Sequence, residues 1–265
     1  MGDAKRKRRS FERRVRPDLP PAPAEIRRLP LDARGFPVPW FVAWLDEAGR
    51  EVPAGQGAPD FRVIGRDRVP RAVKARLCWV CGGRLQQSPV ASVIGPMCVV
   101  NRISSEPPSH PACARWAARA CPFLTRPRMR RNTTGLPADT GPAPGRALDR
   151  NPGVTVLWLS HQVFFDPDVR LFRLGEPVGL EWWCEGRPAT PPEVMAALES
   201  GLPLLRAACD EEPEAERASA HAALDAAIEQ AWRLVPSQWR RPYADVPSFS
   251  RGGGALSGPP AAPDV

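Results

Sequence analysis

The sequence predicts an α+β protein with a small antiparallel sheet, a compact cysteine-containing unit and a C-terminal pair of helices. Three observations predict this class. Short apolar stretches alternate with turn residues, a Cys-x-x-Cys is followed by a His-x-x-Cys, and the last part of the chain carries two helical patterns. The 265 residues are 43% hydrophobic, enough for a real core, while 34 prolines and 21 glycines assign much of the chain to loops and tails.

The N-terminal part is expected to begin with a tail and to continue with strands. Residues 1–30 are basic and rich in proline with few apolar residues, which is typical of disordered segments. Apolar runs separated by Gly and Pro predict two strands, within 36–49 and 59–65, that would form a hairpin. A short helix is expected over 69–77 and an extended segment over 91–100.

The C-terminal part is expected to form strands and then two helices. Alternating apolar residues predict three antiparallel strands, over 154–160, 169–175 and 177–186. Thr190 and Glu193 have the spacing of a capping box, which predicts a helix start, and Gly201 predicts the end of that helix. A longer helix is expected over 214–234.

These elements divide the chain into five expected parts. In order they are the disordered basic tail 1–30, the N-terminal strands with the cysteine unit 31–131, a linker 132–152, strands followed by the helical pair 153–235, and a disordered tail 236–265.

The cysteine unit carries two pairs of residues that bind metals in proteins. Cys78 and Cys81 are followed by Gly-Gly, which allows a tight turn, so both sulfurs can face one ion. His110 and Cys113 are three residues apart at the expected start of a helix, where Pro111 is tolerated, so they share one face. The intervening residues have room for a β-hairpin. A knuckle, a hairpin and a helix in this order predict a treble-clef-like unit, and three thiolates with one imidazole suit tetrahedral Zn²⁺.

Other interpretations of the cysteines stay open at this point. Cys98 is a rival ligand that could replace His110, and the chain could also bind no metal. A redox dithiol is the least favoured interpretation, because the pair lacks the strand-then-helix context of thioredoxin-like sites. The remaining cysteines lie in apolar surroundings and are expected to be buried thiols: Cys121, Cys184 and Cys209.

Charge is distributed unevenly along the chain. The formal net charge is +8. Residues 62–131 carry 14 basic and 2 acidic residues, a balance of +12, whereas residues 132–265 carry 11 and 18, a balance of −7. Only three of the 37 basic residues are lysines, as expected from the codon bias of a GC-rich genome, so the segregation is more informative than the arginine count.

The charge pattern favours a binding function. The segment after the expected helix, TRPRMRRN, concentrates four arginines that are candidate nucleic-acid contacts: Arg126, Arg128, Arg130 and Arg131. The tryptophans, in contrast, follow strand alternation and are expected in the core rather than stacked on bases. A zinc-binding module for nucleic acid is therefore the leading hypothesis, with a protein–protein adaptor as the alternative.

An enzyme is the less favoured class. An HNH-like nuclease would need a catalytic histidine within the expected hairpin, and the sequence has none there. Neither a P-loop nor a Gly-x-Ser-x-Gly elbow is present. The sequence has no apolar run near 18 residues and no secretory signal pattern, so we expect a cytoplasmic protein with no membrane partner. The oligomeric state is left open.

The cysteine segment also carries a resemblance. The stretches CWVCGG and VIGPMCVVNRISSEPPSHPACARWAARACPFLTRPRMRRN, together with GFPVPWFVAW and EGRPATPPEV, resemble a group of uncharacterised proteins from bacterial and phage genomes. The resemblance covers roughly residues 31–235 and leaves out both tails. It implies a phage or prophage setting and implies no mechanism.

Overall fold

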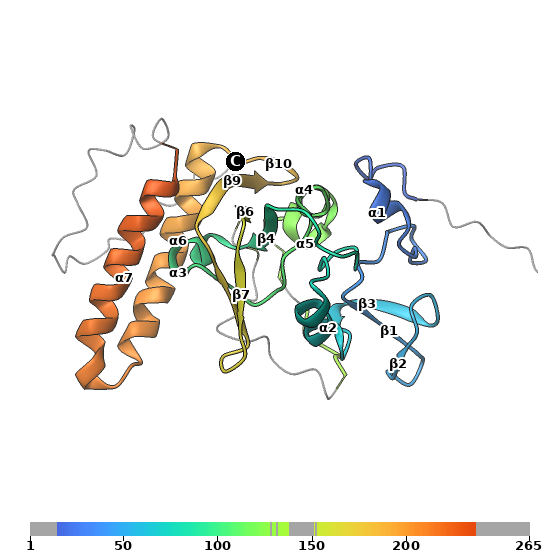
Figure 1. Cartoon of the computed structure of the whole chain (residues 1–265), viewed down its shortest axis with the longest axis horizontal. Coiled ribbons are helices and arrows are strands. Elements are labelled where there is room, and N and C mark those ends of the chain that lie inside the picture. The colour runs from blue at the N-terminus through green and yellow to red at the C-terminus, as the bar shows by residue number, and fades with distance from the viewer. Residues whose placement is uncertain (1–14, 128, 131, 138–150, 152, 237–265) are drawn as a thin grey trace, which may run out of the picture.

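The structure is a computed structural model that describes residues 15–236, apart from 128, 131, 138–150 and 152. Within these residues the fold is α+β, as predicted, with small antiparallel sheets and two long C-terminal helices. The helical pair lies at one end of the molecule and a small sheet at the other, with a central sheet between them (Figure 1). The expected tails at 1–14 and 237–265 lie outside the described residues.

The central sheet has four strands in the order β10-β9-β6-β4, all antiparallel. Its strands are β4 Val90–Ile94, β6 Thr155–Ser160, β9 Pro177–Cys184 and β10 Arg187–Pro188. Strand β4 precedes the expected linker and β6 follows it, and the two pair along their length from Val90↔Ser160 to Ile94↔Val156. The sheet therefore joins the two parts of the chain on either side of that segment.

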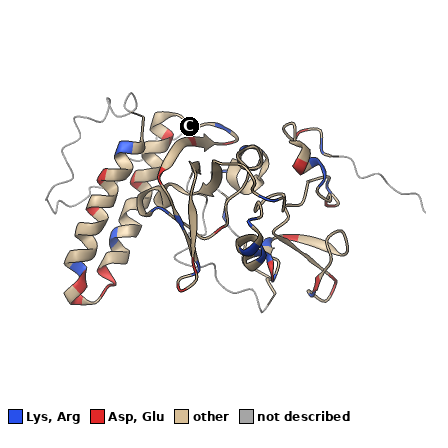
Figure 2. Ribbon diagram, viewed as in Figure 1, with Lys and Arg blue, Asp and Glu red and all other residues tan. Residues whose placement is uncertain are grey.

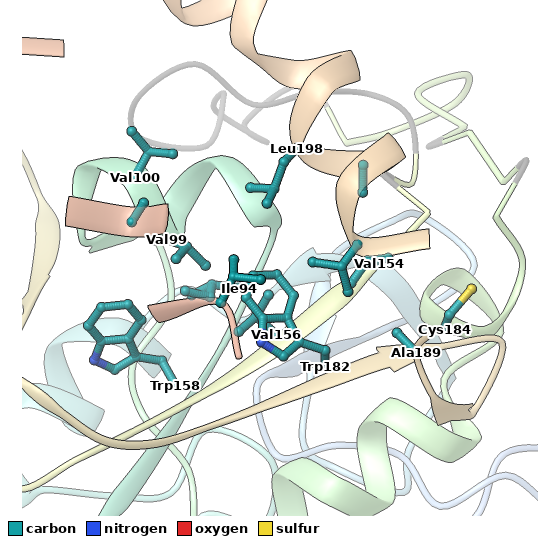
Figure 3. Close-up of a cluster of buried hydrophobic side chains, with 14 of the residues drawn as sticks. Ile94, Val99, Val100, Val154, Val156, Trp158, Trp182, Cys184, Ala189 and Leu198 are labelled. Carbon is teal, nitrogen blue, oxygen red and sulfur yellow. The ribbon is translucent and has the colours of Figure 1, made fainter. Parts of the chain in front are cut away.

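Both faces of the central sheet are covered, which explains the apolar runs of its strands. Side chains alternate between faces along β6, so Val156 and Trp158 face one side and Leu157 faces the other. The first side packs against three helices in the largest hydrophobic cluster (Figure 3): α3 Pro96–Asn101, α6 Pro191–Asp210 and α7 Glu214–Leu234. On the second side lies α4 Pro111–Ala120, through Ala114 and Ala118.

Two small three-stranded sheets flank this core. One has the order β2-β1-β3, with β1 Val42–Leu45, β2 Glu51–Val52 and β3 Ala58–Ile64, and confirms the expected N-terminal pairing. The other has the order β5-β8-β7, with β5 Ile103–Ser104, β7 Val163–Asp166 and β8 Leu171–Leu174. The short helix α2 Arg68–Ala75 follows β3, as predicted, and α5 Pro122–Thr125 follows α4.

The segment 15–30 corrects the prediction of a disordered tail over 1–30. It contains the short helix α1 Ala24–Arg27, and Ile26 on that helix is fully buried. The indole nitrogen of Trp116 donates a hydrogen bond to the carbonyl of Pro20 at 3.2 Å. The average hydrophobicity of this segment is low, so the sequence pattern predicted disorder. The buried side chain of Ile26 and the hydrogen bond to the carbonyl of Pro20 nevertheless hold the segment against α4.

The segment between the two ligand pairs also differs from the predicted hairpin. Only 91–94 of the expected extended stretch lies in a strand, β4, and Pro96 then begins helix α3. Strand β4 pairs with β6, and β5 pairs with β8, so the strands of this segment do not pair with each other. Val99 and Val100 are buried on α3 and contribute to the large cluster, which favours a helix over a continuous strand.

Helix α6 begins as predicted but does not end at Gly201. Its capping box is present: the Thr190 side chain accepts from the backbone N–H of Glu193, and the Thr190 backbone N–H donates to the Glu193 carboxylate at 2.7 Å. Hydrogen bonds from Arg187 and from Thr190 hold the pKa of Glu193 well below its usual range. Gly201 is buried inside the helix, where an added Cβ would lie 2.4 Å from the sulfur of Met97. The glycine therefore permits close packing of α3 on α6 and is not a C-cap.

Candidate metal centre

The structure brings together the four residues that the sequence pattern selected. One ligand atom from each of Cys78, Cys81, His110 and Cys113 lies within 4.8 Å of all the others. Cys78 and Cys81 come from the turn that follows α2, and the other two residues come from the start of α4. This group could hold one metal ion.

The first pair is held by a tight turn. Cys78 donates its backbone N–H to the carbonyl of Gly83 at 2.7 Å, and Gly82 donates to the carbonyl of Cys78 at 2.8 Å. Gly82 has φ +73°, and a Cβ there would lie 2.5 Å from the ring of Trp40. Glycine is therefore required at this position both by the backbone conformation and by the neighbouring ring.

The second pair is held by the start of a helix. Residues Ala91 and Ser109 form an isolated antiparallel bridge, which anchors the chain to β4 just before the ligands. His110 is then the N-cap of α4 and Pro111 its first residue. Cys113 lies in the first turn, so its sulfur is on the same side as the imidazole. The backbone N–H of Trp79 donates to the carbonyl of Pro108 at 3.1 Å and ties the two pairs together.

The distances agree with tetrahedral coordination. Zinc–sulfur bonds of about 2.3 Å and zinc–nitrogen bonds of about 2.0–2.1 Å at a tetrahedral angle place nitrogen and sulfur about 3.6 Å apart. The Nδ1 atom of His110 lies 3.4 Å from the sulfur of Cys81 and 3.8 Å from that of Cys113. The four side chains are thus spaced as ligands of one ion rather than as a disulfide, and all three cysteines are free thiols.

A hydrogen bond to the other ring nitrogen selects the histidine tautomer. Nε2 of His110 lies 3.1 Å from the carbonyl oxygen of Arg84, which can only accept. Nε2 therefore carries the proton and Nδ1 presents its lone pair to the sulfurs. Such a bond from the outer nitrogen of a ligand histidine to a carbonyl is common around bound metals, where it fixes the ring orientation.

Backbone N–H groups favour negative charge on the sulfurs. The Cys78 sulfur faces the amides of Cys81 and His110 at 3.5 and 3.4 Å, and the Cys81 sulfur faces the amide of Gly83 at 3.4 Å. Hydrogen bonds from the thiols of Cys113 and Cys81 strongly lower the pKa of Cys78. The same contacts raise the pKa of Cys113, first through Cys78 and then through Cys81. One thiolate thus forms readily in this group, and a cation is the natural counter-charge for the others.

The group is enclosed by a small hydrophobic cluster. Cys78 and Cys113 are fully buried, while Cys81 and His110 are half-buried. The surrounding apolar side chains come from α1, the turn, β4 and α4: Ile26, Val80, Leu85, Val90, Trp116 and Ala120. Four protein ligands in such a setting fill a tetrahedral shell and leave no position for a substrate, which is typical of structural sites.

The other candidate residues lie elsewhere. Cys98 is on α3, packed against the large cluster, and does not belong to the four-residue group. Burial raises the pKa of both Cys98 and Cys121, as expected of inert thiols. Cys184 is buried in the large cluster, and Cys209 is half-buried near the end of α6.

The arginine segment is only partly described. Arg126 and Arg130 are exposed, whereas Arg128 and Arg131 lie outside the described residues. Of the five tryptophans expected in the core, Trp44, Trp158 and Trp182 are buried, whereas Trp40 and Trp183 are only half-buried.

Sequence reasoning missed the basic surface next to the metal group. Helix α2 carries Arg68, Arg71 and Lys74, and the turn that follows carries Arg76 and Arg84 (Figure 2). The i, i+3 spacing of Arg68, Arg71 and Lys74 could have predicted this surface. The net charge of the whole segment 62–131 does not reveal that spacing.

Comparisons of the chain with protein-family models, with curated proteins and with solved structures gave no match. Among the described helices, none is both long and apolar enough to cross a membrane.

Proposed function

We propose that this protein is a nucleic-acid-binding module organised by one structural zinc ion. Three thiolates and one imidazole form a soft donor set that suits Zn²⁺, and the calculated spacing of a tetrahedral site agrees with the distances from His110 to Cys81 and Cys113. Zinc would connect the turn after α2 to the start of α4. Its contribution is to folding, because metal affinity in small units of this kind is folding free energy.

Binding is favoured over catalysis by the composition of the site. The ligands fill the coordination shell, and the remaining histidines are engaged elsewhere. His161 contacts the hydroxyl of Ser88 at 2.7 Å, and His221 contacts the carboxylate of Asp210 at 2.8 Å. An HNH-like nuclease would need a further histidine beside the metal unit as general base.

The observation that carries the nucleic-acid proposal is the location of the positive charge. Residues 62–131 include all four ligands and have a balance of +12, whereas residues 132–265 have a balance of −7. Arginine forks fit phosphate oxygens, and a surface of one sign attracts the opposite one. Arg126, Arg128, Arg130 and Arg131 belong to the proposed contacts. A phage or prophage setting and a cytoplasmic location complete the proposal; the resemblance described above supports the former.

The test uses the full-length protein purified without added zinc. Metal analysis should give about one zinc per chain. Fluorescence anisotropy with a labelled 20-base-pair DNA should show binding that weakens steeply with salt, with each neutralised phosphate contributing about 0.9 to the log–log slope. Binding should be similar for unrelated sequences of the same length, because phosphate contacts carry no sequence information.

A matched control removes the contribution of the N-terminal basic run. In this variant Lys5, Arg6, Lys7, Arg8 and Arg9 are replaced by glutamine in the full chain. Salt-dependent binding that survives this change supports the proposal. A metal-free but stably folded protein would contradict the zinc site, and no binding at low salt to duplex or single-stranded DNA or RNA would favour the protein adaptor instead.

A further inference from the structure

We infer that the exposed side of helix α2, continued by Arg76 and Arg84, is the surface that contacts the phosphate backbone of double-stranded DNA. This inference rests on the proposed function and names its contact surface. The residues concerned differ from the arginines at 126–131 that the sequence pattern selected.

Positive charge is dense and regularly spaced along helix α2. Residues 66–84 contain six basic residues and one acidic residue, Asp67. Arg68, Arg71 and Lys74 are three residues apart and therefore lie along one side of α2. With a rise of about 1.5 Å per residue, this row extends over about 9 Å of helix axis. One strand of B-DNA presents a phosphate about every 3.4 Å along its axis, so the row can face two or three successive phosphates.

Most of the cationic side chains of this surface have no carboxylate partner. Among the residues that the structure describes, Arg71, Lys74, Arg76 and Arg84 form no ion pair with an acidic side chain. Many arginines elsewhere in the fold are paired, among them Arg62 with Asp60, Arg102 with Glu176, Arg115 with Glu181, Arg173 with Asp166, Arg187 with Glu193, Arg206 with Asp225 and Arg233 with Glu229. On the α2 surface, positive charge therefore exceeds the negative charge of the neighbouring carboxylates Glu51 and Asp67.

The fold holds two of these cations side by side. The guanidinium groups of Arg68 and Arg71 lie over the ring of Trp40, at 4.8 and 5.7 Å from its centre. Burial and the neighbouring charge of Arg71 lower the pKa of Arg68, and the carboxylates of Glu51 and Asp67 offset only part of this. Two like charges on one aromatic ring repel each other, and a phosphate placed between them would relieve that repulsion.

The group of four candidate metal ligands lies beside the other end of this surface and positions it. Arg76 caps α2 in the left-handed conformation with φ +50°, and its carbonyl accepts from the backbone of Leu85 at 2.8 Å. Residues Leu77 and Arg84 form an antiparallel bridge across the knuckle, and the carbonyl of Arg84 accepts the hydrogen bond from His110. Metal binding should therefore fix both Arg76 and Arg84 relative to the helix.

The aromatic rings favour duplex over single-stranded DNA. Proteins that hold single strands stack the bases on exposed rings. Here the ring of Trp40 is covered by the two arginines, and Trp79 is only 3% exposed. Because α2 exposes cationic groups and the rings of Trp40 and Trp79 are covered, this surface is suited to the phosphates on the outside of a duplex.

The experiment compares two triple substitutions in the zinc-loaded full chain. One changes the proposed surface, Arg71→Gln, Lys74→Gln and Arg76→Gln. The other removes the same charge from the helical pair, Arg206→Gln, Arg217→Gln and Arg233→Gln. With a labelled 20-base-pair DNA, the α2 variant should flatten the log–log salt slope by about 2 to 3 and weaken binding by at least about tenfold at low salt. The control should bind like the wild type.

Two further readouts keep the result interpretable. Zinc content and thermal unfolding should match the wild type in both triple variants, which shows that they fold. Because phosphates respond to charge, the variant Arg71→Lys with Arg76→Lys should retain most of the affinity.

The outcomes separate this inference from the proposed function. If the wild type binds DNA and the two triple variants bind equally well, the surface is wrong while the proposed function stands. Tighter binding of the wild type to a single strand of the same length would overturn the duplex assignment. If the wild type binds no nucleic acid, the proposed function fails and this inference fails with it.

Discussion

The region around the four candidate metal ligands and the helical pair are built in different ways. Around Cys78 and Cys113 the structure is mostly turns and short elements, and the local hydrophobic cluster is small. Helices α6 and α7 instead pack on one face of a continuous sheet through a large apolar cluster. The comparison indicates that one region depends on ligand chemistry and the other on apolar packing, so they should respond differently to the same perturbations.

The two regions also differ in surface charge. The charged residues of helix α2 and of the following turn are all basic, whereas the connection between α6 and α7 and the first turn of α7 carry four acidic residues, Glu211, Glu212, Glu214 and Glu216 (Figure 2). Repulsion keeps an acidic helical pair away from a DNA backbone. Under the proposed function, this difference favours an approach to nucleic acid through the end that carries the candidate metal ligands, with the helical pair left in solvent.

The largest expected effect separates the two regions by removing one ligand. Cys81→Ala should abolish metal binding and melt the turn and the start of α4, because structural zinc contributes on the order of 10 kcal/mol in small finger peptides. The helical pair should retain more of its structure. Metal analysis and limited proteolysis of the variant would measure both effects.

Cys98→Ser is the matched control for that variant. Its thiol lies in the large cluster, so the substitution should keep the metal and cause a modest loss of stability. His110→Ala should reduce metal affinity far more than Cys98→Ser. The opposite ranking would show that Cys98 is a ligand and would remove His110 from the site.

A smaller effect is expected from Gly82→Ala, in the turn that carries Cys78 and Cys81. The substitution combines a left-handed backbone with a Cβ placed 2.5 Å from the Trp40 ring. Gly135→Ala is the control, because that glycine has φ +70° and no atom within 4 Å of an added Cβ. The control should cost about 1–2 kcal/mol from backbone strain alone.

Gly82→Ala should therefore cost clearly more than the control when the free energies of unfolding are measured in urea. Equal losses in the two variants would mean that Trp40 moves aside freely, and that the ring does not fix the turn.

The smallest expected effect is that of Gly201→Ala, at the contact between helices α3 and α6. Glycine to alanine inside a helix normally stabilises by about 1 kcal/mol. At Gly201 the same change should destabilise by about 1–3 kcal/mol, because the new methyl group overlaps the side chain of Met97. Chemical denaturation of Gly201→Ala in the wild-type and Met97→Ala backgrounds would measure the interaction. If the penalty persists without the Met97 side chain, the close approach is not its cause.

The grouping of the four candidate ligands was predictable because their information is local. Cys-x-x-Cys followed by Gly-Gly, and His-x-x-Cys at a helix start, specify geometry within a few residues of chain. The capping box at Thr190 and the long helix over 214–234 were predictable for the same reason and are confirmed. The choice between His110 and Cys98 required the fold, since only the path of β4 and α3 carries Cys98 away from the other sulfurs.

The features that the sequence did not predict depend on distant contacts. Burial of Ile26 comes from a cluster assembled from four separate segments, and the packing role of Gly201 comes from a methionine about 100 residues earlier. Strands β7 and β10 are short and lie at sheet edges, where local propensity is weak. The fold of Pro96–Asn101 as a helix follows from apolar contacts with α6 and α7, which no local pattern contains.

The pairing of β4 with β6 has a consequence for the order of events during synthesis. All four ligands leave the ribosome before Thr155, the first residue of β6, and about 40 residues lie between Cys113 and that strand. At about 5–20 residues per second this interval lasts roughly 2–8 s. Under the proposed function, the cysteines would bind zinc during that interval, while the edge of β4 is still unpaired, and the zinc-loaded unit would then serve as the template for the pairing of β6.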